Sequence, residues 1–287
     1  MKGLLTKVVG FSLAATCILG LASCKTQKLE VGKEYVVASS QLDALMKLDK
    51  GEADVAVIDS VMAGYYTSTG DYAAKMQMVD GLVFAEESYG IAAKKGNDAL
   101  ISKINEALIA IRTTDYATLA TEYGLTSSVA LTETTTNPKS EATDSSWTDV
   151  VNSGTIVIGY TIFAPIAYEE NSVLTGFDIE LAKKTIDYLN VQYSTNLQVE
   201  FLLIDWNTKE AKLADGTIDL VWNGMTITSQ REAEMCISIP YLFNKQVAVV
   251  LKSDAAKFTD VASMATAVMT AETGSAGETV IVGEQDE

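Results

Sequence analysis

The side chains available for chemistry exclude several classes of enzyme. The 287 residues contain no histidine, so neither a Ser-His-Asp triad nor a histidine-ligated metal site can be built from this chain. Of the three cysteines, Cys236 alone lies far from the N-terminus. Without a histidine partner, Cys236 is better interpreted as a small buried apolar residue than as a nucleophile. Carboxylates, arginine and hydroxyl groups are left as the candidate functional groups.

Two charged residues occupy positions where a ligand could be held. Asp59 directly follows the apolar residues 55–58, which are predicted to form a strand. A carboxylate at the carboxyl end of such a strand faces the crevice of an open α/β sheet. Alternatively, Asp59 is the N-cap of a helix that begins at Ser60. Arg231 has the planar fork of donors that suits a ligand carboxylate, although its position after a loop is equally typical of a surface arginine.

The net charge argues against nucleic acid as a partner. Lys and Arg number 21 and Asp and Glu number 38, a formal net charge of −17, and a phosphate backbone is repelled by such a field. Hydrophobic residues make up 48% of the chain and charged residues 21%. This composition indicates a folded protein with a core large enough for one or two domains.

The N-terminus has the features of an export signal. Two lysines precede an apolar run, Val8–Leu21, that is too short to span a bilayer comfortably. The run ends in the string LASC, which resembles a bacterial lipobox, where the cysteine carries lipid. We therefore expect residues 1–23 to be removed as a signal peptide, Cys24 to anchor the protein to the membrane, and residues 24–32 to form a tether. The alternative is an ordinary signal peptide with a chance cysteine.

Strands and helices alternate along the rest of the chain, which predicts an α/β protein with largely parallel sheets. Residues 126–146 are rich in Thr, Ser and Glu and predict an exposed, mobile linker. The predicted strands cover residues 35–38, 54–58, 89–93, 155–158, 197–204, 218–222 and 246–251, and the predicted helices cover residues 42–48, 101–111, 115–123, 177–190 and 210–214.

Several strings in the second half of the chain resemble one family, the polar amino-acid solute-binding proteins of ABC importers. The resemblance implies a periplasmic-binding-protein fold with two α/β lobes, a ligand crevice between them and a hinge of two crossing strands. It covers nearly all of the mature chain. The strings are IGYTIFAP (158–165), LTGFDIELA (174–182), DGTID (215–219) and WNGMTIT (222–228), with Arg231 three residues further on.

The order of the segments differs from the usual order in that family. The GFDI segment, normally close to the N-terminus, follows the linker, and the segments that normally come last precede it. The chain is therefore predicted to be circularly permuted, with residues 126–146 joining the family's usual termini. The smaller lobe would comprise residues 33–87 and 253–287, and the larger lobe residues 88–125 and 147–252. A truncated gene and a join between neighbouring genes are the competing interpretations.

The resemblance also implies roles for single residues. Arg231 matches the arginine that binds the ligand carboxylate bidentately, and Asp59 matches the carboxylate that pairs with the ligand ammonium group. Phe163 matches an aromatic residue that stacks on the ligand. Further predicted contacts come from Trp206, Asn223, Gly224, Met225, Thr226, Ser275 and Ala276, with Thr161 and Trp222 as additional candidates to line the pocket.

The expected function is the capture of a free amino acid and its delivery to an ABC permease in the membrane. The protein would be an extracytoplasmic, lipid-anchored monomer without catalytic activity, cofactor or metal. One alternative is an enzyme on the same fold, similar to cyclohexadienyl dehydratase, with Asp59, Asp205 or Glu278 as the general acid. Another is a lipid-anchored amino-acid sensor. The family's polar residue in the first loop, which often contacts a basic ligand side chain, has no clear match here unless Thr161 serves. This argues against Lys, Arg or His as the ligand, and the bound amino acid stays open.

Overall fold

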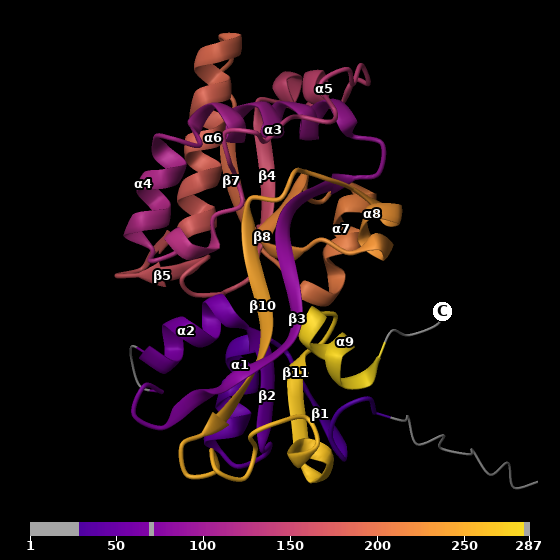
Figure 1. Cartoon of the computed structure of the whole chain (residues 1–287). Coiled ribbons are helices and arrows are strands. Elements are labelled where there is room, and N and C mark those ends of the chain that lie inside the picture. The colour runs from indigo at the N-terminus through magenta and orange to yellow at the C-terminus, as the bar shows by residue number, and fades with distance from the viewer. Residues whose placement is uncertain (1–28, 69–71, 284–287) are drawn as a thin grey trace, which may run out of the picture.

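The computed structural model describes residues 29–68 and 72–283. Figure 1 shows two α/β lobes joined by two long strands, β3 (Met76–Lys94) and β10 (Leu242–Leu251). The predicted signal peptide and Cys24 lie outside the described residues. Within the described part of the chain, none of the helices combines the length and the apolar composition needed to cross a membrane.

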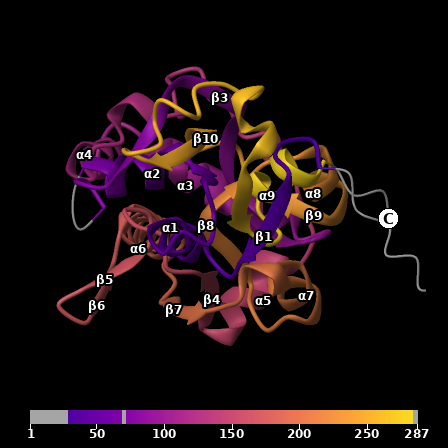
Figure 2. The same ribbon diagram turned by 90° about the horizontal axis from the view of Figure 1, so that it is seen from below.

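The smaller lobe is built on three parallel strands in the order β1-β11-β2. All five residues of β2 are buried, because both faces of this strand are covered, as is usual in parallel sheets. Figure 2 shows this lobe from below. Its elements are β1 (Glu34–Ala38), α1 (Gln41–Asp49), β2 (Val55–Asp59), α2 (Ser60–Ser68), β11 (Val268–Glu272) and α9 (Ala276–Val282).

The larger lobe is built on β7, β4 and β8, which pair in parallel. Along β8 the side chains alternate between two cores: Leu220 and Trp222 pack with α3 and α6, whereas Val221 and Met225 pack with α7. The elements of this lobe are α3 (Asp98–Ile111), α4 (Asp115–Glu122), α5 (Ser146–Ser153), β4 (Thr155–Tyr160), β5 (Tyr168–Glu170), β6 (Val173–Thr175), α6 (Phe177–Tyr193), β7 (Gln198–Leu203), α7 (Lys209–Asp215), β8 (Leu220–Thr226), α8 (Ser229–Glu234) and β9 (Met235–Ile237).

The sheet is mixed, so the prediction of largely parallel sheets is wrong for its centre. β3 and β10 pair antiparallel with each other, β10 pairs antiparallel with β2, and β3 pairs antiparallel with β8. The reason is the path of the chain between the lobes. β3 runs from the smaller lobe into the larger one and β10 runs back, so the two strands must point in opposite directions (Figure 1).

β10 enters the smaller lobe earlier than predicted. Val247 and Val249 pair with Ile58 and Ala56 of β2 and pack in the same hydrophobic cluster. The larger lobe therefore ends close to Gln246 and not at the predicted residue 252. The apolar run 247–250 is buried in the smaller lobe, whereas Phe243 and Lys245 before the crossing point are exposed.

The long strand β3 has different neighbours along its length. In the larger lobe Tyr89 and Ala93 pair with β8, and Tyr89 also lies opposite Leu242 of β10. Residues 246–251 instead lie opposite the earlier half of β3, between Met76 and Ala85. With 19 residues, β3 is long enough to contact a different neighbour in each lobe.

Strand β2 and the chain before Gly274 share the smaller lobe, as the rotated segment order requires. Met269 and Thr270 of β11 pair in parallel with Val55 and Ala56 of β2, and Gly274 follows β11 directly. Residues more than 200 positions apart in the sequence are therefore neighbours in one sheet.

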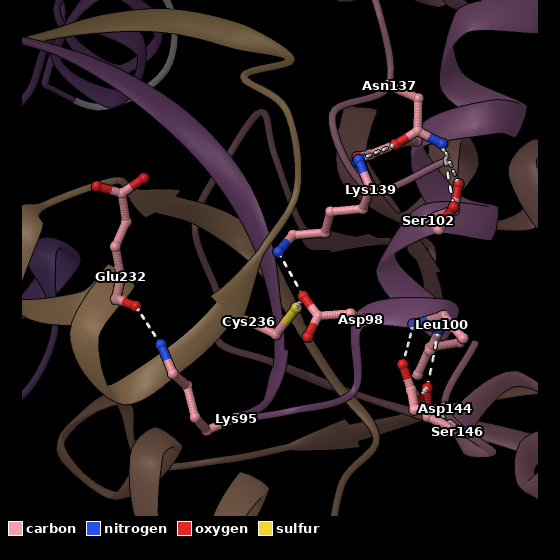
Figure 3. Close-up of polar contacts among 12 residues, drawn as sticks. Lys95, Asp98, Leu100, Ser102, Asn137, Lys139, Asp144, Ser146, Glu232 and Cys236 are labelled. Carbon is pink, nitrogen blue, oxygen red and sulfur yellow. Dashed lines mark hydrogen bonds and ion pairs between the residues drawn. The ribbon is translucent and has the colours of Figure 1, made fainter. Parts of the chain in front are cut away.

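The second half of the predicted linker is attached to the N-terminus of α3 (Figure 3). The backbone N–H of Ala99 donates to Asp144 Oδ2 at 2.7 Å, and the N–H of Leu100 donates to Ser146 Oγ at 2.9 Å. The first N–H groups of a helix have no partner within the helix. Side chains from a distant segment thus cap α3, where the adjacent Asn97 forms no side-chain capping bond.

Two further contacts hold the same segment along α3. Asn137 Nδ2 donates to the Ser102 carbonyl at 2.9 Å, and Lys139 Nζ forms an ion pair with Asp98 at 2.5 Å. The prediction of a mobile linker is therefore wrong for residues 137–146. Composition indicated few apolar groups to bury, but polar side chains can anchor a segment by capping a helix.

The first and last described segments lie against each other. The backbone N–H groups of Glu30 and Val31 donate to the Ile281 carbonyl at 2.9 and 3.3 Å, and both ends lie in the smaller lobe (Figure 1). A short connection could therefore join these ends without moving either lobe.

This proximity gives a direct test of the rotated segment order. A chain in which a short Gly-Ser spacer joins Gly283 to Glu30, and which is opened between Thr134 and Thr135, should fold like the original, because the broken connection is exposed. Circular dichroism and thermal unfolding would measure this. A matched chain that also lacks residues 137–145 loses the cap of α3. Its free energy of unfolding should therefore be lower by about 1 kcal/mol. Failure of the first chain to unfold cooperatively would contradict the permutation.

Candidate functional site

A crevice between the lobes collects almost all of the predicted site residues. Both lobes contribute, at the carboxyl ends of the parallel strands β2, β11, β4 and β8, where open α/β sheets place their ligands. The crevice is narrow: its cavity volume is about 20 Å³, which is room for roughly one water. It is lined by Gln41, Asp59, Thr161, Ile162, Phe163, Trp206, Asn223, Gly224, Thr226, Arg231, Glu272, Ser275 and Ala276.

Asp59 lies at the end of β2 and is surrounded by amide donors. Gln41 Nε2 and Asn244 Nδ2 donate to its two carboxylate oxygens, and Gln246 Nε2 donates to Oδ1 at 2.9 Å. Gln41 Oε1 in turn accepts from the Asp59 backbone N–H at 3.0 Å. These bonds hold the carboxylate at the crevice instead of leaving it to cap α2.

A second carboxylate shares these donors. Glu87 Oε2 accepts from Asn244 Nδ2 and Gln246 Nε2, each at 3.0 Å, and from Thr226 Oγ1 at 3.1 Å. Glu87 lies on β3 where this strand passes between the lobes. Burial, together with the negative charge of Glu87, raises the pKa of Asp59 to about 7.

Arg231 contacts both lobes. Its Nη1 donates to the Thr226 carbonyl at 2.8 Å, and its Nη2 donates across the crevice to the Gly274 carbonyl at 3.1 Å. Thr228 caps α8 through a side-chain oxygen that accepts from the Arg231 N–H, which fixes where the side chain begins. Burial lowers the pKa of the guanidinium, but arginine stays charged in proteins.

The backbone of Gly224 is directed away from the crevice. Its N–H donates to Asp178 Oδ2 at 2.7 Å and to the Tyr241 hydroxyl at 3.2 Å. Its φ of 61° favours glycine, and a Cβ here would lie 2.6 Å from the ring of Phe163. Asp178, the aspartate of the GFDI string, thus holds the backbone of Gly224 in position without lining the crevice itself. Burial raises the pKa of Asp178 to about 7 against the hydrogen bonds from Tyr241 and Gly224.

Aromatic and polar side chains of the larger lobe form one wall. Phe163 and Trp206 are both buried and line the crevice. Thr161 is paired with Asn223: with the amide oriented to satisfy both partners, Asn223 Oδ1 accepts from Thr161 Oγ1 at 2.7 Å and Nδ2 donates to the Thr161 carbonyl at 3.1 Å. Trp222, in contrast, packs against Tyr241 in the core.

Met225 is the predicted site residue that lies elsewhere. It is fully buried in a hydrophobic cluster with Leu213 and Ile218 and does not line the crevice. Ser275 lines the crevice, but its N–H donates to the Glu272 carbonyl at 3.2 Å, so that amide is engaged within its own turn.

Sequence analysis missed five polar residues of this site. A signal for one existed: Glu272 ends the buried strand β11 just as Asp59 ends β2. The others come from the start of α1 and from the crossing strands, where their spacing indicates no function. The missed residues are Gln41, Glu87, Asn244, Gln246 and Glu272.

Neither a metal site nor a reactive thiol is found in this region. Within residues 29–68 and 72–283, no group of three or more His, Cys, Asp or Glu could hold a metal ion. Cys236 is buried and its Sγ donates to Asp98 Oδ1 at 3.2 Å. Burial raises the pKa of this thiol to about 12, so it stays protonated, and a thiolate nucleophile is not available.

Comparison with known families shows which binding proteins part of this chain resembles. Residues 156–275 match the family described as bacterial extracellular solute-binding proteins, family 3. The matched segment begins in β4, ends at Ser275 and includes the crevice residues Phe163, Thr226 and Arg231. Residues 156–275 of this chain are therefore similar to this class of binding protein.

Amino-acid-binding proteins are among its relatives. The probable amino-acid-binding protein YxeM of Bacillus subtilis (strain 168) is 27% identical over 90 residues, 31% of this chain and 32% of that protein. An ABC uptake transporter substrate-binding protein from Streptococcus pneumoniae, solved with histidine, is 34% identical over 31% of this chain and 34% of that one, with a TM-score of 0.27. An ancestral arginine-binding protein bound to arginine is 36% identical over 28% of this chain and 34% of that one, with a TM-score of 0.25. The chain thus spans about a third of the length of these relatives.

Three buried carboxyls should make the folded protein less stable as the pH rises. Burial, then the charge of Asp59, raises the pKa of Glu272 to about 8, although Lys209 opposes the shift, and the pKa values of Asp59 and Asp178 are also raised. The folded state therefore binds more protons than the unfolded state above about pH 4. The contribution of these groups to stability is complete below that pH and is lost as the pH rises through about 7 to 8.

Thermal unfolding without ligand should show a higher midpoint at about pH 6 than at about pH 8.5. Glu272→Gln should reduce this slope, because it removes one of the groups that ionise. Glu200→Gln, at an exposed position on β7, is the matched control and should keep the slope of the wild type. A midpoint that rises with pH over this range would contradict the assignment.

Proposed function

We propose that this protein binds a free α-amino acid in the crevice between its lobes. The observation that carries the proposal is the meeting of Asp59 and Arg231, from opposite lobes, in one partly buried site. An amino acid has a carboxylate for the guanidinium and an ammonium group for the carboxylate. The similarity to amino-acid-binding proteins supports the same conclusion.

Binding in this crevice requires the lobes to move. The space is too narrow for an amino acid, and Arg231 bonds the Gly274 carbonyl of the other lobe directly. The lobes are connected by β3 and β10, whose pairing is irregular around Gln246 and Val247. We infer that this crossing is the hinge, because hinge closure around a ligand needs a few positions that absorb the change in backbone angles.

The proposed role is binding without catalysis. Two of the carboxylates considered as a general acid are engaged elsewhere: Asp205 caps a short 3-10 helix, and Glu278 accepts from Tyr35 and from the Gly274 N–H. Asp59 is held by three amide donors. The similarity to substrate-binding proteins supports the same proposal.

We also propose that the segment order is a circular permutation. The family match starts in β4 and stops at Ser275, whereas the strands that complete the smaller lobe, β1 and β2, come from the beginning of the chain. Under this proposal the smaller lobe combines residues from about 33–87 with residues from the end of β10 onward. Residues 126–146 join the ends that are free in the common order.

The crevice proposal is tested by two substitutions and an amino-acid screen. Calorimetry with the common amino acids should find at least one ligand. Asp59→Ala and Arg231→Ala should each weaken its binding by about 3 kcal/mol, or roughly a hundredfold, because each leaves a ligand charge unpaired. Gln230→Ala, at an exposed position on α8 beside Arg231, should bind like the wild type. Full affinity in either crevice variant would refute the assigned contacts.

We further propose that the protein is an extracytoplasmic lipoprotein that delivers its ligand to an ABC permease. The LASC string ending at Cys24 supports lipid attachment, and the match to an extracellular family supports the location. In cell fractionation, the wild type should be found with the membranes, and Cys24→Ser should be released or left unprocessed, because it has no thiol for the acyl chains. Cys236→Ser is the matched control. Unchanged membrane association of Cys24→Ser would exclude the anchor.

A further inference from the structure

Glu272 lines the crevice with a carboxylate that no protein group satisfies. The residue ends β11 and is 5% exposed. Among the described residues, no side-chain or backbone donor forms a hydrogen bond or an ion pair with its carboxylate. Asp59, at the end of the neighbouring strand, is in contrast held by three amides. A buried carboxylate without donors is costly, so its presence at a binding crevice needs an explanation.

The charged groups around Glu272 do not neutralise the negative charge of its carboxylate. The crevice lining contains two carboxylates, Asp59 and Glu272, and one guanidinium, Arg231. Glu87 adds a further carboxylate beside Asp59. Lys209, another cation whose charge acts on Glu272, directs its Nζ to Glu210 at 2.9 Å and to backbone carbonyls. With all of these groups ionised, the site would have an excess of negative charge.

A zwitterionic ligand leaves this excess unchanged. The α-carboxylate of an amino acid would pair with Arg231, and its α-ammonium group would pair with Asp59. These two ligand groups together add no net charge to the site. Glu272 would then be covered by the ligand side chain, away from water. A neutral side chain would leave the carboxylate buried and unpaired, whereas a cationic one would supply both the opposite charge and the missing donors.

We propose that Glu272 selects α-amino acids whose side chain carries an ammonium or guanidinium group. This inference rests on the proposed amino-acid binding in the crevice. The aromatic rings of Phe163 and Trp206 line the same space, and ring faces also attract cations. The proposal makes Glu272 the residue that determines specificity, while Asp59 and Arg231 bind the groups common to all amino acids.

The protonation of Glu272 is consistent with this role. Burial and the charges of Asp59 and Asp205 raise its pKa to about 8, with Lys209 opposing. Without a cation, Glu272 thus holds a proton through much of the neutral range. A cationic side chain would lower that pKa, so the carboxyl would release its proton as the ligand binds. Binding of a cationic amino acid should therefore be accompanied by proton release.

Calorimetry with pairs of ligands of matched shape tests the proposal. Arginine and citrulline differ mainly in the charge of the side chain, as do lysine and norleucine. The wild type should bind at least one cationic member about tenfold or more tightly than its neutral partner. Glu272→Gln should reduce that ratio to near one, chiefly by weakening the binding of the cationic partner. Glu272→Asp, which keeps the charge, should retain part of the preference.

The outcomes separate this inference from the proposed function. If the wild type binds neutral amino acids as tightly as their cationic partners, the role of Glu272 is refuted and amino-acid binding stands. If Glu272→Gln keeps the preference for the cationic partner, the role of Glu272 is likewise refuted and amino-acid binding still stands. If no amino acid binds, both proposals fail. Glu200→Gln, which removes one exposed negative charge from β7, controls for net charge and should keep the wild-type ratio. If Glu272→Gln does not fold, the ratio of cationic to neutral affinity in the wild type decides whether the proposal stands.

Discussion

The antiparallel pairing of β3 with β10 is the contact on which the rest of the molecule depends. These strands cross from one lobe to the other, and their register shifts on either side of Val247. Such irregularities increase the local twist of a strand pair. The same crossing brings Glu87, Asn244 and Gln246 to the end of β2, where they surround Asp59. The hinge and the polar floor of the crevice are thus one structural feature.

The electrostatics of the crevice follow from this geometry. Asp59 and Glu87 share amide donors, and Glu272 lies at the end of the strand next to β2 with no donor of its own. Carboxylates in such an arrangement resist ionisation because burial removes water and each charge repels the others. The site is therefore prepared for positive charge, and Arg231 is the group that makes it suitable for a ligand carboxylate as well.

The proposed rotation of the segment order is consistent with the contacts at its two ends. Glu30 and Ile281 are hydrogen-bonded neighbours in the smaller lobe. Residues 137–146 are attached to α3 in the larger lobe, through the cap formed by Asp144 and Ser146. Fold stability depends on which elements pack together more than on where the chain is interrupted. A lobe assembled from both ends of the chain can therefore be as well packed as a continuous one.

The sequence by itself determined the local elements and the chemical limits of the site. Apolar periodicity indicated α3 and α6, because burial of one face leaves a regular pattern. Short continuous apolar runs indicated β2 and the end of β10, which are buried on both faces. The absence of histidine excluded whole classes of mechanism, and the charge at the end of β2 marked Asp59 as a candidate. The tertiary structure decided what surrounds these groups. Asn244 contacts Asp59 across 185 positions, and Asp178 takes the Gly224 amide that was expected to face the ligand. Such contacts depend on how the lobes and strands are aligned in space, and no local pattern of residues carries that information.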